Sequence, residues 1–152
     1  MINYTKAKLS DIVHMQEVVK PEVEKGIILF RSSDEMATNI RSYILAKEDD
    51  QIIGFGALHF HADNLAEIRS LVVKEGFRGR GVGKGIIQNL LIDGENLGVK
   101  KVFTLTYQKA FFESVGFSEI SKEALPAHKI WADCIKCKHF PICDEIALIK
   151  TI

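Results

Sequence analysis

Hydrophobic residues alternate with polar ones, or gather in short apolar runs, over several segments that have the length of β-strands. These segments are 2–7, 43–46, 51–60, 67–73, 102–106 and 145–149. The polar sequence Lys47-Glu48-Asp49-Asp50 separates two of them and predicts a β-hairpin, and Ala62-Asp63-Asn64 predicts a second turn. We therefore expect a chain rich in strands that follow one another closely.

Apolar residues recur at helical spacing between the strand segments. Ser10 is expected to cap a first helix, which should weaken near Pro21. The apolar positions of this helix are Ile12, Val13, Val18 and Val19. The sequence Ser32-Ser33-Asp34-Glu35 has the S-x-x-E form of a capping box and predicts a second, short helix towards Ile40.

Two further helices are predicted in the second half of the chain. The first stops at Gly94 or Gly98, and the second covers 108–115 and ends at Gly116. The apolar face of the first consists of Ile86, Ile87, Leu90 and Leu91. Hairpin strands followed by strand, loop, helix and strand predict a mixed α/β sheet. Because there is no internal repeat or linker-like tract, we expect one domain over 1–152.

Composition and charge narrow the classes of function. The 152 residues are 47% hydrophobic, and 20 basic side chains balance 20 acidic ones. A neutral chain has no global field for nucleic acid or anionic membrane, so neither is expected as a partner. No apolar run reaches the roughly 18 residues of a membrane span, and the polar N-terminus does not resemble a signal peptide. We therefore expect a cytoplasmic protein with a small-molecule substrate, and a homodimer is possible.

The strongest chemical signal is the glycine-rich sequence Arg78-Gly79-Arg80-Gly81-Val82-Gly83-Lys84, between a predicted strand and a predicted helix. Glycines allow the main chain to approach a ligand, and the N–H groups and dipole of the following helix favour an anion such as pyrophosphate. A P-loop is excluded because Gly85 follows Lys84, and the dinucleotide fingerprint lacks its third glycine. The alternative is a flexible surface turn that happens to be basic.

These residues resemble the pyrophosphate-binding signature R/Q-x-x-G-x-G/A of the GNAT family of N-acetyltransferases. The order of predicted elements and the sequence Phe111-Phe112-Glu113-Ser114-Val115-Gly116-Phe117 are similar to the family over essentially the whole chain. The resemblance implies a mixed, mostly antiparallel central sheet flanked by helices and splayed at the motif strand. It also implies acetyl-coenzyme A as co-substrate. The implied binding residues are Leu71, Val72 and Val73 for the pantetheine arm, and Arg78, Gly79, Arg80, Gly81, Val82, Gly83 and Lys84 for the pyrophosphate.

Within this family, four segments resemble single-domain amino-acid N-acetyltransferases of the N-acetylglutamate synthase type. They are 26–32, 66–71, 102–107 and 125–131, the last followed by a cysteine cluster and Cys143-Asp144-Glu145. The resemblance implies transfer of acetyl to the α-amino group of an amino acid, most closely glutamate, as in arginine biosynthesis. It places Leu29, Arg31, Ser32 and Ser70 at the acceptor, and the bidentate guanidinium of Arg31 suits a carboxylate.

An α-amino group is mostly protonated at neutral pH, so it must lose a proton before it attacks a thioester. Glu67 resembles the family's proposed base; otherwise it is a surface carboxylate paired with a lysine. A main-chain N–H near Leu71 or Val72 would stabilise the oxyanion. Thr106, with Tyr107 beside it, resembles the donor to the departing thiolate. The tyrosine that is often found in the family before Glu-x-x-Gly-Phe is replaced by Phe112, which has no proton to give, so the acid role shifts to Thr106 or Tyr107. The alternative is that no dedicated acid is needed, because a coenzyme A thiol is itself acidic.

Glu67 and Ser70 are three residues apart, so a regular strand would send their side chains to opposite faces. A β-bulge between Glu67 and Leu71 would bring both to one site. Members of the resembled family carry such a bulge, and we predict it here. We also predict that this strand splays from 102–106.

His59 and His61 share one face of a predicted strand. We expect them to be exposed hydrophilic positions, although such a pair can bind metal and His59 could relay a proton. Cys134, Cys137 and Cys143 lie in a tail insert over 134–143 and, with His139 or His128, could hold a structural zinc ion. Reduced thiols or a Cys134–Cys137 redox pair are the preferred alternatives, so no metal site is predicted.

Three other functions stay open from the sequence. The chain could acetylate a different small amine or a protein N-terminus, it could bind coenzyme A as a regulatory module without turnover, or it could be a zinc-dependent interaction protein. Arg31 favours an anionic acceptor over a cationic amine, and the presence of Glu67 and the donors favours an enzyme.

Overall fold

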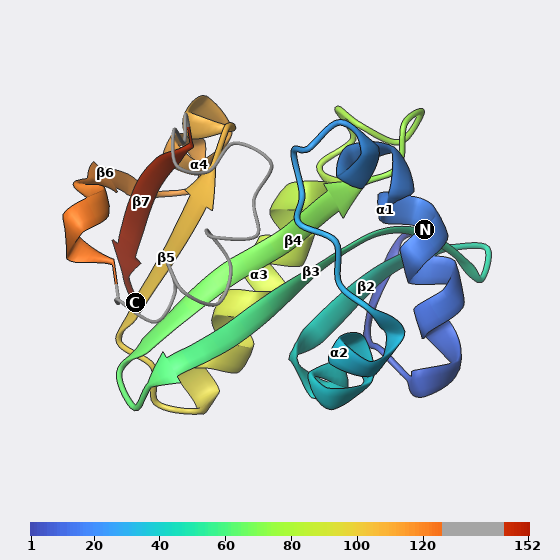
Figure 1. The fold of residues 1–152 in the computed structure, drawn as a ribbon, viewed down its shortest axis with the longest axis horizontal. Coiled ribbons are helices and arrows are strands. Elements are labelled where there is room, and N and C mark those ends of the chain that lie inside the picture. Colours follow the sequence, from blue (N-terminus) through green and yellow to red (C-terminus); the bar gives the residue numbers. More distant parts are fainter. Residues whose placement is uncertain (126–144) are drawn as a thin grey trace.

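The computed structural model describes residues 1–125 and 145–152, and their core is one β-sheet with helices on both faces (Figure 1). The sheet has seven strands in the order β1-β2-β3-β4-β5-β7-β6. Their bounds are β1 Asn3–Lys6, β2 Tyr43–Glu48, β3 Gln51–Ala62, β4 Leu65–Val73, β5 Lys101–Thr106, β6 Ser118–Ile120 and β7 Ile146–Thr151. Neighbouring strands are antiparallel except for β4 and β5, which are parallel. The predicted mixed, mostly antiparallel sheet is confirmed, and β6 is a strand that the pattern did not predict.

The β2–β3 hairpin turns at Asp49 and Asp50, which both have positive φ, 52° and 62°. Two central residues of this conformation form the two-residue turn that matches the twist of an antiparallel pair. The predicted hairpin is therefore confirmed, although β2 continues two residues past the predicted 43–46.

The helices are α1 Ile12–Glu24, α2 Ser33–Thr38, α3 Val82–Asn96 and α4 Lys109–Ser114, and short 3-10 turns cover Leu9–Asp11, Ile40–Ser42 and Lys122–Ala124. The predicted ends at Gly98 and Gly116 are confirmed: both residues have positive φ, 93° and 98°. Gly94, the other predicted stop, lies inside α3. None of the helices in the described ranges is long and apolar enough to cross a bilayer.

Two predictions for α1 are wrong. Ser10 does not cap the helix, because it lies within the 3-10 turn that precedes Ile12. The helix also continues through Pro21 for three more residues, and the Lys25 N–H donates to the Pro21 carbonyl (3.1 Å). Met15 and its apolar neighbours pack this helix onto the sheet, and such packing outweighs the hydrogen bond that a proline removes.

Figure 1 shows helices on both faces of the sheet. Each face carries a separate apolar cluster. On one face, α1 and α2 pack through Met15 and Met36 on Tyr43 and Phe55. On the other, α3 packs through Ile86 and Leu90 on β2, β3 and β4. Helix α3 lies so close to β1 that a Cβ added to Gly85 would overlap the Tyr4 hydroxyl. The first turns of α3 therefore pack directly against the Tyr4 side chain.

Candidate functional site

Strand β4 contains a bulge where the sequence predicted one. Val72 is paired with Phe55 and Arg69 with Ala57, so Ser70 and Leu71 together lie opposite the single residue Gly56. The φ of Ser70 is 58°, a left-handed conformation that is uncommon for residues other than glycine. The predicted bulge between Glu67 and Leu71 is confirmed.

The bulge reverses which face each later side chain occupies. Before it, Ile68 packs in the α3 cluster; after it, Leu71 and Val73 pack in that cluster, while Val72 packs in the cluster below α1 and α2. The extra residue has therefore shifted the alternation by one position. As a result, Glu67 and Ser70 both line one cleft, although three residues separate them.

Strands β4 and β5 separate just beyond Glu67. Their parallel ladder runs from Leu65 opposite Lys101 to Glu67 opposite Phe103 and then stops, whereas β5 stays paired with β7 as far as Thr106. Figure 1 shows the two strands diverging towards their carboxyl ends. At the point of divergence the buried Thr104 hydroxyl donates to the Ile68 carbonyl (2.9 Å). The predicted splay from 102–106 is confirmed.

A cleft of about 480 Å³ lies in this opening. Four parts of the chain line it: the residues 67–73 of β4, the glycine-rich loop with the first turn of α3, the residues 104–108, and the segment 27–31 after α1. Glu22 of α1, Phe111 and Phe112 of α4 and Glu145 in front of β7 complete its wall. An elongated ligand can therefore run between the diverging strands and reach the N-terminus of α3.

The glycine-rich loop brings main-chain donors to this cleft. Gly79 and Gly81 have φ values of 79° and 78°, and Gly81 is the N-cap of α3. The first helical bond there runs from the Gly85 N–H to the Gly81 carbonyl (3.0 Å), so the N–H groups of 82–84 precede the hydrogen-bonded ladder. Amides at a helix start bind anions, and these three residues line the cleft.

The basic residues of the loop differ in position. The Arg78 guanidinium donates to the Glu22 carboxylate (2.8 Å) and to the Val73 carbonyl (2.9 Å), which joins the loop to α1 beside the cleft. Arg80 instead pairs with Glu48 (2.8 Å) and does not line the cleft. Lys84 is exposed and lines the cleft. Two of the three predicted phosphate-binding side chains are therefore beside the cleft, and Arg80 is not.

Glu67 is buried at the base of the cleft, with 1% of its surface exposed. Its Oε1 lies 2.9 Å from His61 Nε2, and the His61 side chain is 3% exposed. The alternative of a surface carboxylate paired with lysine is therefore wrong. So is the expectation that both histidines are exposed, since His59 is half-buried too. His59 and His61 continue the alternation of Phe55 and Ala57 along β3. This alternation with buried apolar positions is the sequence signal that would have predicted the burial of the two histidines.

Thr106 and Tyr107 both line the cleft at the end of β5. The Thr106 hydroxyl accepts from the Gln108 N–H (2.9 Å) just before α4, so the Thr106 hydroxyl hydrogen is not used in this bond. The Tyr107 hydroxyl is buried. Phe112, at the position of the family's tyrosine, packs between Phe111 and Phe117 with ring centroids 5.3 Å apart in both pairs. The residues that line the cleft therefore include hydroxyl groups at Thr106 and Tyr107, whereas Phe112 has none.

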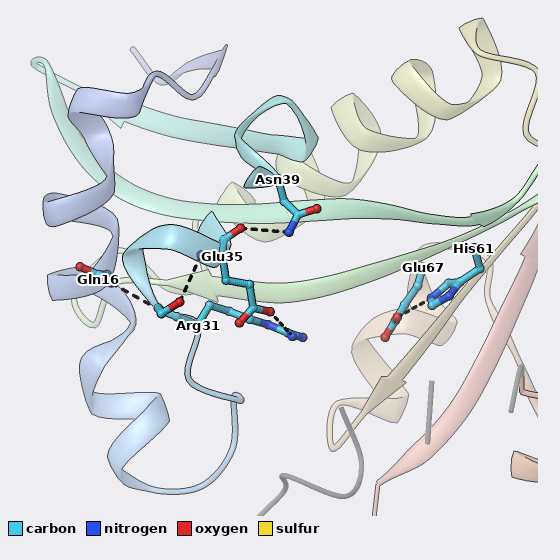
Figure 2. A network of polar contacts seen from close by, with 7 residues as sticks. Gln16, Arg31, Glu35, Asn39, His61 and Glu67 are labelled. Atoms are coloured by element: carbon cyan, nitrogen blue, oxygen red, sulfur yellow. Dashed lines mark hydrogen bonds and ion pairs between the residues drawn. The ribbon is translucent and has the colours of Figure 1, made fainter. Parts of the chain in front are cut away.

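Arg31 is buried, with 8% of its surface exposed, and lines the cleft together with Leu29 and Ser70. Its Nη1 donates to Glu35 Oε2 (2.8 Å), as Figure 2 shows. Ser32 is not among the cleft residues, because it caps α2 and its hydroxyl accepts from the Glu35 N–H (3.1 Å). The capping box is thus only half formed, since the Glu35 carboxylate bonds to Arg31.

Leu29, Arg31 and Ser70 also line a second cavity of about 450 Å³ between α1, α2 and the sheet. Its walls are mainly apolar and include Tyr43 and Phe55. Burial raises the pKa of the Tyr43 hydroxyl, and the positive charges of Arg31 and Arg69 oppose that shift. Arg31 lines both cavities, and Arg69 lines the cleft.

A metal site is absent from the part of the chain that the structure describes: within it, no three His, Cys, Asp or Glu side chains gather to hold an ion. The residues of the possible zinc site, from His128 to Cys143, lie outside the described residues.

The acetyltransferase (GNAT) family model matches residues 11–117. The chain belongs to this family. It is 38% identical over 146 residues to an uncharacterized N-acetyltransferase of Chlorobaculum tepidum, a match that covers 96% of this chain and 94% of the relative. It is 30% identical over 118 residues to the amino-acid acetyltransferase of Mycobacterium tuberculosis, covering 76% of this chain and 67% of that protein.

Solved structures share the fold. The N-acetylglutamate synthase of Neisseria gonorrhoeae, complexed with coenzyme A and N-acetyl-glutamate, superimposes with a TM-score of 0.88 at 22% identity. That match covers 99% of this chain but 35% of the synthase, so the chain corresponds to about a third of the larger protein. A Mycobacterium tuberculosis protein in complex with coenzyme A gives a TM-score of 0.84 at 23% identity and covers 99% of both chains.

We predict that Thr104→Val destabilises the fold by about 1–3 kcal/mol, because the buried Ile68 carbonyl loses its donor at the strand divergence. Urea unfolding followed by circular dichroism measures the change. Thr104→Ser keeps the hydroxyl and is the matched control, with most of the stability retained. A valine variant as stable as the serine variant would show that this hydrogen bond does not hold the two strands together.

Proposed function

We propose that this chain transfers the acetyl group of acetyl-coenzyme A to the α-amino group of an amino acid, with glutamate as the preferred acceptor. The observation that carries the proposal is the buried carboxylate of Glu67 in a cleft that also receives Arg31 and the N-terminus of α3. The amino-acid acetyltransferases among its relatives support the substrate class. We interpret residues 1–152 as one transferase domain that makes N-acetylglutamate, a precursor in arginine biosynthesis.

The cleft fits coenzyme A. Its glycine-rich end presents the N–H groups of 82–84 to a pyrophosphate, and an added Cβ on Gly83 would lie 3.2 Å from the Phe111 ring and narrow this end. Arg78 and Lys84 supply positive charge there, and Leu71, Val72 and Val73 run along the middle of the cleft. When bound, the coenzyme would supply an acetyl thioester, and Glu67 lines the same cleft.

The residues of this chain then have separate tasks. Glu67 takes a proton from the acceptor ammonium group, so that its nitrogen can attack the thioester carbon. The main-chain N–H groups at the bulge, near Leu71 and Val72, donate to the carbonyl oxygen as it gains charge. Thr106 or Tyr107 donates to the sulfur as the carbon–sulfur bond breaks. The ammonium loses two protons overall; one ends on the thiol and the other goes to solvent.

Arg31 is assigned to a carboxylate of the acceptor. It lies at the boundary of both cavities and is already held by Glu35, so the acceptor adds a second carboxylate to a guanidinium with five donors. Arg69 lies on the same side and adds a second positive charge. An acceptor with two carboxylates is therefore favoured over a polyamine.

A specific observation supports a second candidate acceptor. The cavity behind Arg31 has mainly apolar walls, which suit an amino acid with a hydrophobic side chain whose α-carboxylate binds Arg31. This candidate shares the reaction and the catalytic residues with the first, and only the acceptor differs.

A panel of amino acids with acetyl-coenzyme A, with thiol release as the readout, tests the proposal. We expect glutamate to give the highest kcat/KM, with aspartate and glutamine lower. A preference for leucine or phenylalanine would select the second candidate. A panel with no turnover, combined with turnover of polyamines or peptide N-termini, would reject amino-acid acetylation.

The cofactor assignment predicts that Gly81→Val weakens coenzyme A binding at least tenfold, because a β-branched residue cannot hold a φ of 78° and displaces the N–H groups of α3. Isothermal titration calorimetry measures the affinity. Gly76→Val is the matched control: Gly76 is in the same loop with a φ of 92°, but it does not line the cleft. Equal losses in both variants would mean that loop strain, and not the anion site, determines binding.

The acceptor assignment predicts that Arg31→Ala raises KM for glutamate by about 20-fold or more, since an unpaired buried carboxylate costs about 2–5 kcal/mol. KM for acetyl-coenzyme A should hardly change. Glu35→Gln is the control, because it removes the ion pair but keeps the guanidinium. If both variants change stability equally and leave KM for glutamate unaltered, Arg31 is structural.

A further inference from the structure

A buried histidine holds the carboxylate at the base of the cleft. His61 Nε2 and Glu67 Oε1 are 2.9 Å apart, and the exposed fractions of the two side chains are 3% and 1% (Figure 2). Burying an ionised carboxylate is costly unless hydrogen-bond donors surround it. A His61 tautomer with a proton on Nε2 supplies such a donor, since an ionised carboxylate can only accept.

Packing against neighbouring rings fixes the orientation of the His61 imidazole. The His61 ring lies against Phe103 of β5 and His59 of β3, with centroid distances of 5.3 and 4.7 Å. His59 is the register partner of Glu67 in the β3–β4 ladder, and Phe103 is its partner across the β4–β5 ladder. The imidazole is therefore held by strands on both sides of Glu67 and has little freedom to turn away.

We propose that His61 is the positioning residue of the catalytic base: its Nε2–H holds Glu67 Oε1, so that the carboxylate stays ionised and directs Oε2 to the acceptor amine. The proposal rests on the proposed function, in which Glu67 takes the amine proton. His61 touches Glu67 and does not line the cleft, so it acts through the carboxylate and not on the substrate.

Other charged or titratable groups of the described chain lie beside this pair or line the same cleft as Glu67. They are His59 of β3, which contacts the His61 ring, and Arg69 of β4, Tyr107 just after β5 and Glu145 in front of β7, which line the cleft. His61 Nε2 lies 2.9 Å from Glu67 Oε1, within hydrogen-bond distance. A substitution at His61 therefore alters a direct contact of Glu67, whereas these other groups are identical in all of the variants compared.

The test compares His61→Phe and His61→Gln in the wild-type and Glu67→Gln backgrounds. Phenylalanine suits the aromatic neighbours but cannot donate, whereas the glutamine amide can still donate towards Oε1. We expect Glu67→Gln to lower kcat/KM by about 10²–10⁴-fold, the usual contribution of a general base. His61→Phe should lower it by at least tenfold and move the acid limb of its pH profile to higher pH. His61→Gln should restore most of the rate and the wild-type limb.

The double variant separates positioning from a structural role. If His61 acts through Glu67, His61→Phe changes kcat/KM less than about twofold in the Glu67→Gln background. Equal losses in both backgrounds with no movement of the acid limb would overturn the proposal. Should His61→Phe fail to fold, His61→Asn replaces it, because its shorter amide does not reach Oε1.

Failure of the proposed function has a different signature. If Glu67→Gln keeps the wild-type rate, then Glu67 is not the base, whatever the His61 variants do. If the acceptor proves to be another amine but the acid limb still moves in His61→Phe, the positioning role stands and only the acceptor changes. Calorimetry with coenzyme A should give the wild-type affinity for every variant, because neither residue belongs to the pyrophosphate end of the cleft.

Discussion

The interruption of hydrogen bonding beyond Glu67 is the constraint on which the rest of the structure depends. A sheet that stayed paired through β4 and β5 would have no cleft, and a strand without the extra residue at Ser70 would turn Ser70 away from the side of Glu67. The energetic cost of the gap is limited by two features: Thr104 satisfies the Ile68 carbonyl at the divergence, and β7 pairs the free side of β5. The site is therefore a gap between β4 and β5 in a sheet whose other neighbouring strands stay paired.

Charge in this molecule is arranged locally and not globally. A chain with 20 basic and 20 acidic side chains has no net field, yet it concentrates a helix N-terminus with Arg78 and Lys84 at one end of the cleft. Glu22 holds Arg78 beside this end and joins α1 to the loop. Glu48 holds Arg80 at a distance from it. The carboxylates that neutralise the loop thus also decide which of its arginines faces the cleft.

Periodicity predicted most of the fold, because β2–β5 and α3 have apolar faces that their packing requires. The bulge was also predictable, since two side chains three residues apart had to serve one site. Three other features could not be predicted from the sequence, because each depends on tertiary contacts. They are the role of Ser32, the exposure of the histidines and the course of α1 at Pro21. Ser32 is engaged by α2, His61 is enclosed by Phe103 and Glu67, and α1 is held on the sheet beyond Pro21. Short β6 has too few residues to carry a pattern, and it forms because β7 offers it an edge.

The two carboxylate contacts of the site show how a buried charge is kept available for chemistry. Glu67 is held by His61, whose ring packs against His59 and Phe103, and this contact fixes the carboxylate that we propose as the base. Arg31 is held by Glu35 through Nη1, which orients a guanidinium that carries five N–H donors. In both pairs the partner fixes the geometry of the functional group. A stronger partner at either place would stabilise the fold and weaken the reaction that we propose.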